Sequence, residues 1–166
     1  MKTNDTPVRE LFGFERDPFV PDPAAIWLDD QREDAVEQLQ SLVARRGFAV
    51  LTGPAGCGKT ILLGHLCLQL GANTHRIIYV ACAECEPTDM LRLVCAGLDL
   101  EPALGRSRMI RRIADRVAEM KGITPVLIID EAQSLPQATL ETVRVTCSSS
   151  LDGRNRFAVI MAGADE

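Results

Sequence analysis

One eight-residue segment combines the residue types that bind phosphate groups. Its sequence is Gly53-Pro54-Ala55-Gly56-Cys57-Gly58-Lys59-Thr60, and it fits the pattern GxxxxGK[ST] without a mismatch. Glycines in such a loop let the backbone wrap closely around phosphates and turn its N–H groups toward them. Lys59 would reach the β- and γ-phosphates of a nucleotide, and the Thr60 hydroxyl would ligate Mg²⁺. We therefore predict that the segment from Gly53 to Ile61 binds a nucleotide.

Two adjacent carboxylates follow an apolar run later in the chain. The run is Val126-Leu127-Ile128-Ile129, and Asp130 and Glu131 come directly after it. Because ligands bind outside the carboxyl ends of strands in open parallel sheets, we expect both side chains near the phosphate loop. Asp130 would hold Mg²⁺ directly or through water, and Glu131 would polarise the attacking water. Lys59 and Glu131 are thus the predicted catalytic residues, and Thr60 and Asp130 are the predicted metal ligands.

The position of Glu131 bears on the class of reaction. P-loop proteins that activate water carry a glutamate directly after the metal-binding aspartate, whereas small-molecule kinases usually lack it. Water is therefore the expected phosphoryl acceptor, and a small-molecule kinase is disfavoured because no acceptor site is evident either. Gln133 follows two residues later and would either reach the same water or cap the turn before Pro136.

Short apolar runs and amphipathic segments alternate along the chain, and they must position these residues. Strands are predicted at 48–52, 76–81, 125–129 and 157–162, where continuous apolar runs are typical of strands buried on both faces. Helices are predicted at 29–46, 60–70, 87–98, 107–120 and 137–148. The alternation predicts βαβ units, and so an α/β fold with a parallel sheet and helices on both faces.

The composition is that of one soluble globular domain. The chain has 166 residues, of which 46% are apolar and 25% are charged, close to the globular average. Aromatic residues make up only 4%, so the core must be aliphatic. The formal net charge of −5 disfavours a globally basic nucleic-acid-binding protein, although it still allows a local basic patch.

Neither a membrane segment nor a secretion signal is expected. No apolar run reaches the roughly 18 residues of a membrane span, and residues 1–5 lead into no apolar segment. Most of the six cysteines lie inside apolar runs, which suits reduced thiols in a cytoplasmic protein. Cys82 and Cys85 form a lone CxxC pair without a nearby histidine, so we expect ordinary strand-end residues rather than a metal or redox site.

Three segments together carry a family resemblance. They are Asp130-Glu131-Ala132-Gln133, the loop of residues 53–60, and the N-terminal Phe12-Gly13-Phe14 with Asp17-Pro18-Phe19. With these segments the chain resembles the ExeA-like AAA+ ATPases, a family that includes the general secretion pathway protein A type and transposition helpers of the TniB/TnsC kind. The resemblance covers nearly the whole chain, and the N-terminal signature is its most family-specific part.

The resemblance implies a three-layer P-loop NTPase fold of the AAA+/ASCE type with a mostly parallel sheet. It implies an ATPase that works as a homo-oligomer, with ATP and Mg²⁺ as cofactors and a partner in the secretion or transposition machinery. It carries over Lys59 and Thr60 as phosphate and Mg²⁺ residues, Asp130 as the metal residue, and Glu131 as the catalytic base. It also suggests that Arg32 opens the helix that flanks the nucleotide.

Two departures from the family pattern affect the expected activity. The family's fourth strand usually ends Ala-Gly-Gln-Pro-Glu, whose polar side chain senses the γ-phosphate, whereas Ala164 stands at that position here. The family also continues into a trans-acting arginine, a fifth strand and a helical lid, which these 166 residues lack. We therefore expect an N-terminal arm at 1–28 and an ATPase core at 29–166 that is truncated after the fourth strand, lacks the C-terminal lid, and hydrolyses ATP slowly.

The function expected from the sequence is an ATP-binding and ATP-hydrolysing AAA+ core that couples its nucleotide state to oligomer or partner contacts. The main alternative is a nucleotide-binding switch or adaptor with little hydrolysis of its own. Ala164 and the missing arginine and lid favour this alternative.

Five arginines crowd the predicted helix at 107–120 and its start: Arg106, Arg108, Arg111, Arg112 and Arg116. Arg108, Arg112 and Arg116 share a face at i, i+4 spacing. They would either contact the phosphate backbone of DNA, as a transposition helper needs, or form a solvated helix face. The solvated face is favoured, because no aromatic residues interleave for base stacking.

Overall fold

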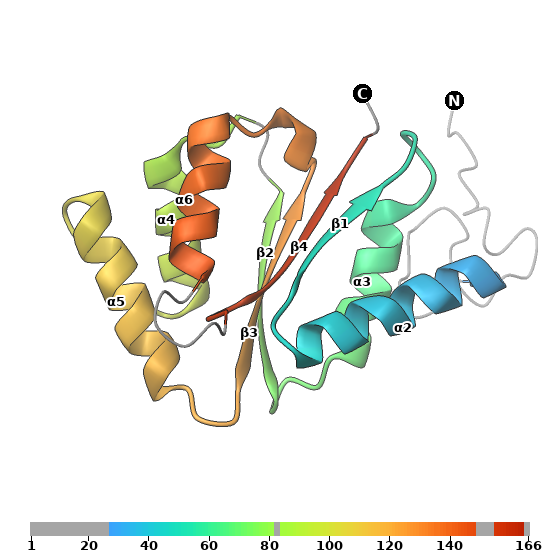
Figure 1. The fold of residues 1–166 in the computed structure, drawn as a ribbon, viewed down its shortest axis with the longest axis horizontal. Helices are drawn as coiled ribbons and strands as arrows, with labels where there is room; N and C mark the ends of the chain where they lie inside the picture. Colours follow the sequence, from blue (N-terminus) through green and yellow to red (C-terminus); the bar gives the residue numbers. More distant parts are fainter. Residues whose placement is uncertain (1–26, 82–83, 149–154, 165–166) are drawn as a thin grey trace, which may run out of the picture.

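The computed structural model describes residues 27–81, 84–148 and 155–164. Its centre is a sheet of four parallel strands in the order β1-β4-β3-β2 (Figure 1). The strands are β1 (Phe48–Thr52), β2 (His75–Ala81), β3 (Thr124–Asp130) and β4 (Ala158–Gly163). The parallel sheet and the helices between its strands confirm the predicted α/β class.

Helices cover both faces of this sheet (Figure 1). α2 (Asp30–Ala44) and α3 (Lys59–Gln69) pack on one face, whereas α4 (Pro87–Gly97), α5 (Arg106–Glu119) and α6 (Gln137–Cys147) pack on the other. A 3₁₀ turn, η2 (Ala132–Ser134), lies between β3 and α6. This arrangement confirms the expected three layers, a mostly parallel sheet with helices on both faces.

β3 is an inner strand and carries the acidic motif at its end. Val126 and Ile128 are buried on the side of α2 and α3, whereas Leu127 and Ile129 are buried on the side of α4, α5 and α6. Because both faces of the strand are covered, its residues form an uninterrupted apolar run before Asp130. This packing gives the carboxyl end of β3 a fixed position.

β4 comes last in the chain yet lies between β1 and β3. Gly163 pairs with Thr52 of β1, and Met161 pairs with Ile129 of β3. The carboxyl ends of these three strands therefore lie side by side at one end of the sheet. There the phosphate loop, Ala164 and the acidic motif come together.

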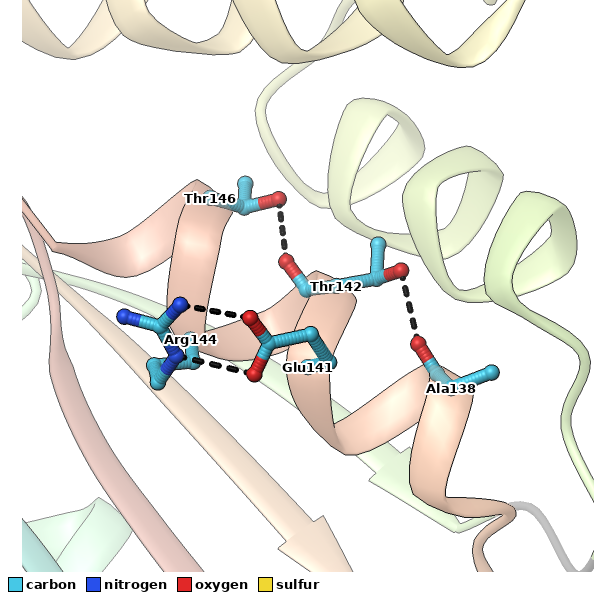
Figure 2. Close-up of polar contacts among 5 residues, drawn as sticks. All are labelled: Ala138, Glu141, Thr142, Arg144 and Thr146. Atoms are coloured by element: carbon cyan, nitrogen blue, oxygen red, sulfur yellow. Dashed lines mark hydrogen bonds and ion pairs between the residues drawn. The ribbon is translucent and has the colours of Figure 1, made fainter.

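α6 follows the acidic motif, and its buried Thr139 makes a hydrogen bond to the segment before α4. This fully buried residue donates its hydroxyl to the carbonyl oxygen of Cys85 over 2.6 Å. On the exposed side of α6, Arg144 donates from Nε and Nη2 to the carboxylate of Glu141 (Figure 2). These hydrogen bonds lower the pKa of Glu141. Exposed ion pairs contribute little to stability, so the buried threonine contact matters more for holding α6 in place.

Residues 1–26 lie outside the described part of the chain, and so do the Phe12-Gly13-Phe14 and Asp17-Pro18-Phe19 signature segments. The division of the chain into an N-terminal arm at 1–28 and an ATPase core at 29–166 therefore stays a prediction. None of the helices in the described ranges is both long and apolar enough to cross a membrane. The cytoplasmic location is not tested by this observation and also stays a prediction.

Candidate nucleotide-binding and catalytic site

The phosphate loop connects the end of β1 to the start of α3, as the sequence predicts. Gly56 and Gly58 have φ values of 78° and 93°, which lie in the left-handed region that favours glycine. A Cβ atom at either position would meet nothing within 4 Å. The glycines therefore serve the backbone conformation, and the space beside the loop stays open. A loop of this shape at a helix N-terminus suits a phosphate group.

Lys59 folds back over its own loop. Its Nζ donates to the carbonyl oxygens of Gly53, over 2.7 Å, and Pro54, over 3.0 Å. The ammonium group thus lies at the loop, where a phosphate would compete with these two carbonyls for it. This position is the one that the predicted phosphate contact needs.

Thr60 and Asp130 come from two motifs that are 70 residues apart, and the fold joins them directly. Thr60 Oγ1 donates to Asp130 Oδ2 over 2.7 Å. Asp130 is only 4% exposed, and its second oxygen, Oδ1, accepts from the backbone N–H of Glu131 over 3.0 Å. A hydroxyl and a carboxylate are hard oxygen ligands of the kind that Mg²⁺ prefers. The two predicted metal ligands therefore fit this ion in type and lie close enough to share it.

Tyr79 of β2 is a further contact of the same carboxylate, and sequence reasoning missed it. Its hydroxyl donates to Asp130 Oδ2 over 2.7 Å. Desolvation raises the pKa of Tyr79 well above its ordinary value, and the hydrogen bond to Asp130 raises it further. Tyr79 therefore stays a neutral donor at physiological pH. One feature of the sequence could have indicated this contact: Tyr79 is a polar-tipped side chain in an otherwise aliphatic run, two residues before the end of β2.

Glu131 lies directly after the strand and adopts a left-handed backbone conformation, with φ at 56°. Non-glycine residues rarely adopt this conformation, although Arg46, Glu84 and Asp99 also do so here. The exposed carboxylate of Glu131 accepts from Gln133 Nε2 over 2.6 Å. Backbone bonds close the turn itself, so the side chain of Gln133 is not its cap.

A pocket of about 320 Å³ opens between α2 and the phosphate loop. Arg32 lines it, and its Nη2 donates to the carbonyl oxygen of Cys57 over 3.3 Å. Asp29 caps α2 by accepting from the backbone N–H of Arg32, and it also pairs with the Arg32 guanidinium. The start of α2 therefore flanks the loop, in line with the expectation for Arg32. The pocket has the size of a small-molecule site.

The arginines of α5 do not form one equivalent surface. Arg106, Arg108, Arg111 and Arg112 are exposed, whereas Arg116 is half-buried. Arg116 donates from Nε to the carbonyl oxygen of Leu98 and pairs with Glu119. Of the three arginines predicted to share an exposed face, only Arg108 and Arg112 are therefore exposed. Arg116 instead contacts residues of the chain itself. DNA contact through this helix stays a prediction.

The CxxC pair is only half within the described part of the chain, since Cys82 lies outside it and Cys85 is buried. In the described ranges, no group of three or more His, Cys, Asp or Glu side chains could hold a metal ion. A magnesium ion at Thr60 and Asp130 would therefore take its other ligands from phosphate and water.

Cysteine reactivity offers a test of which groups line the site. Cys57 is half-buried in the phosphate loop, with Sγ 3.9 Å from Lys59 Nζ. Cys147 is fully buried at the end of α6, and burial raises its pKa to about 12. Because the thiolate is the reactive form, a thiol reagent at about pH 8 should modify Cys57 long before Cys147. Peptide mapping by mass spectrometry measures both rates.

Adding Mg²⁺ and ATP should slow the modification of Cys57 and leave the modification of Cys147 unchanged. A Cys57→Ala variant identifies the modified peptide. Equal modification of Cys57 with and without nucleotide would contradict the assignment of this loop as the phosphate site.

Comparisons with known proteins agree with this geometry. The family described as AAA domain matches residues 42–166. General secretion pathway protein A from Aeromonas hydrophila is 28% identical over 170 residues, which cover 95% of this chain and 30% of that relative. The chain therefore spans less than a third of the length of this curated relative.

Two solved structures share the fold. Cdc6p from Pyrobaculum aerophilum superposes with a TM-score of 0.67 at 21% identity, over 95% of this chain and 43% of that one. PCH-2 from C. elegans superposes with a TM-score of 0.51 at 16% identity, over 83% and 38% of the two chains. Since the family match includes both the phosphate loop and the acidic motif, the chain belongs to the AAA domain family, and its resemblance to the ExeA-like P-loop ATPases is confirmed.

Proposed function

We propose that this chain binds ATP with Mg²⁺ at the loop from Gly53 to Ile61 and hydrolyses the ATP. The observation that carries the proposal is the hydrogen bond between Thr60 and Asp130. It joins the end of the phosphate loop to the acidic motif, with Glu131 as the next residue. Phosphate-binding groups, metal ligands and a candidate base thus meet at the carboxyl ends of β1 and β3, which flank β4, and ligands bind at this end of open parallel sheets.

Each residue has a role that follows from its position. Backbone N–H groups of the loop and the ammonium of Lys59 bind the phosphates. Thr60 and Asp130 hold Mg²⁺, which neutralises phosphate charge when it is bound. Tyr79 keeps the Asp130 carboxylate oriented through its hydrogen bond. Glu131 is exposed beside the metal ligands and accepts a proton from the water that it orients.

The adenine and ribose have a candidate site in the pocket between α2 and the loop. Arg32, Ala35 and Leu51 contribute to its wall, together with residues of the loop itself. The pocket adjoins the phosphate loop, so one nucleotide can occupy both. This placement gives α2 a part in sensing whether a nucleotide is present.

The nucleotide state would then control contacts of the domain in a homo-oligomer or with a partner protein. The name of the Aeromonas relative favours a secretion partner, whereas a transposition partner would make DNA contact through Arg106, Arg108, Arg111 and Arg112 plausible. Both partner assignments, and a cytoplasmic location, belong to the proposal.

A nucleotide-binding switch with little turnover is a second candidate, and Ala164 is the observation that favours it. Its side chain offers no polar atom at the strand end beside the phosphate loop. A switch of this kind would bind ATP and change its contacts without rapid hydrolysis.

ATP binding and ATP turnover, measured across a range of chain concentrations, separate these candidates. If neighbouring chains complete each site, turnover per chain should rise with concentration until the oligomer is fully formed. Tight binding with no turnover at any concentration would select the switch and exclude hydrolysis. A turnover per chain that stays constant would contradict the oligomeric site.

A further inference from the structure

We infer that Gln133 is a positioning residue that holds the Glu131 carboxylate in place and ties it to the end of β4. Its Nε2 donates to Glu131 Oε2 over 2.6 Å, and its Oε1 accepts from the backbone N–H of Ala164 over 3.2 Å. The two ends of one amide are thus both engaged. The inference rests on the proposed role of Glu131 as the base of ATP hydrolysis.

Gly163 supplies a second and independent observation for this link. A Cβ atom at Gly163 would lie 2.7 Å from Gln133 Oε1 and 3.3 Å from its backbone nitrogen. The φ of Gly163 is not in the left-handed region, so the backbone conformation does not require glycine there. The absence of a side chain therefore serves the close approach of Gln133.

The strand pairing shows what this link connects. Gly163 pairs with Thr52, the last residue of β1 before the phosphate loop. Ala164 therefore follows a residue that lies beside the last residue before that loop. Gln133 completes a path from the phosphate loop, through the end of β4, to the carboxylate of Glu131.

The link matters because, among the residues that the structure describes, Gln133 alone makes a hydrogen bond to the Glu131 carboxylate. Glu131 is exposed, and its backbone N–H bonds to Asp130 while its carboxylate bonds to Gln133. A glutamate at the surface samples several rotamers, and an error of about 1 Å in a reacting group costs as much as a hundredfold in rate. Gln133 fixes the carboxylate relative to the phosphate loop. It also brings a polar group to the strand end where Ala164 has none.

The first test compares Gln133→Ala and Gln133→Glu with the native chain. Gln133→Ala should reduce kcat by about ten- to a hundredfold, with the ATP dissociation constant within about twofold of native. Gln133→Glu keeps the acceptor for Ala164 but places a negative charge against Glu131. Because the two carboxylates repel each other, kcat of Gln133→Glu should be at least as low as that of Gln133→Ala, with the ATP dissociation constant again near native. A purely structural role predicts that kcat and ATP affinity fall together.

Gly163→Ala tests the link from its other end, because the new methyl group displaces the Gln133 amide. It should lower kcat in the native background and have much less effect in the Gln133→Ala background. Additive effects would overturn the inference. If Gly163→Ala fails to fold, the kcat of Gln133→Glu, which keeps the acceptor for Ala164 but repels Glu131, decides the question alone.

A measurement without turnover separates this inference from the proposed function. The side-chain amide resonance of Gln133, identified by its loss in Gln133→Ala, should move in ¹⁵N NMR spectra when Glu131 is replaced by alanine, because Nε2 then loses its acceptor. The same resonance should keep its position when the exposed Glu101 is replaced by glutamine. If the movement in Glu131→Ala is seen while native turnover is absent, the link stands and the hydrolysis proposal fails. An amide resonance that is insensitive to Glu131, or native kcat in Gln133→Ala and Gln133→Glu, would overturn the link.

Discussion

With Glu131 replaced by glutamine, ATP turnover should fall by about two to four orders of magnitude while ATP still binds. The substitution preserves the size of the side chain, and the new amide oxygen can still accept from Gln133 Nε2. The fold and the metal ligands Thr60 and Asp130 are left in place. What is lost is the carboxylate that takes a proton from water. Steady-state release of phosphate and a fluorescent-nucleotide titration measure the two quantities.

Glu101→Gln is the matched control for this prediction. Glu101 is exposed in the turn after α4, and the substitution removes the same charge away from the phosphate loop. It should leave both turnover and affinity unchanged. If Glu131→Gln hydrolyses ATP at the native rate, Glu131 is not the base and another group must activate the water.

Lys59→Ala should weaken ATP binding by about a hundredfold, because charge-assisted hydrogen bonds to phosphate are among the strongest a side chain makes. In the structure the ammonium is held by the carbonyls of Gly53 and Pro54, at the position where phosphates would enter. Turnover should disappear with binding at moderate ATP concentration. Titration of ATP into the variant, at matched Mg²⁺, measures the loss.

Lys121→Ala provides the control, since Lys121 is an exposed lysine in the turn after α5. The two variants have the same net charge, so a difference between them reports position rather than charge. Equal ATP affinity in Lys59→Ala and Lys121→Ala would contradict the proposal that Lys59 and its loop bind the phosphates of ATP.

The sequence predicts the parts of this site that depend on local pattern. The phosphate loop has fixed spacing between its glycines, Lys59 and Thr60, and it must follow a strand and begin a helix. Asp130 and Glu131 follow a continuous apolar run, which is typical of a strand that is buried on both faces. The residues around each motif therefore predict the strand, turn or helix in which it lies. The structure agrees, since Thr60 donates a hydrogen bond to Asp130.

The contacts that the sequence does not predict depend on which strands are neighbours. Tyr79 reaches Asp130 because β2 pairs with β3, and Gln133 reaches Ala164 because β4 inserts between β1 and β3. Local periodicity does not specify strand order. Arg116 shows the same limit, because its spacing suggested an exposed face while its partner, the carbonyl of Leu98, comes from another element.

Isothermal titration calorimetry of the native chain with ATP tests the central claim most directly. In the presence of Mg²⁺ we expect one ATP site per chain. Affinity should fall when EDTA removes the metal, because the phosphates then lose the ion held by Thr60 and Asp130. No binding heat and no competition with a fluorescent nucleotide at up to about 1 mM ATP would contradict the phosphate-loop assignment, and with it the proposed function.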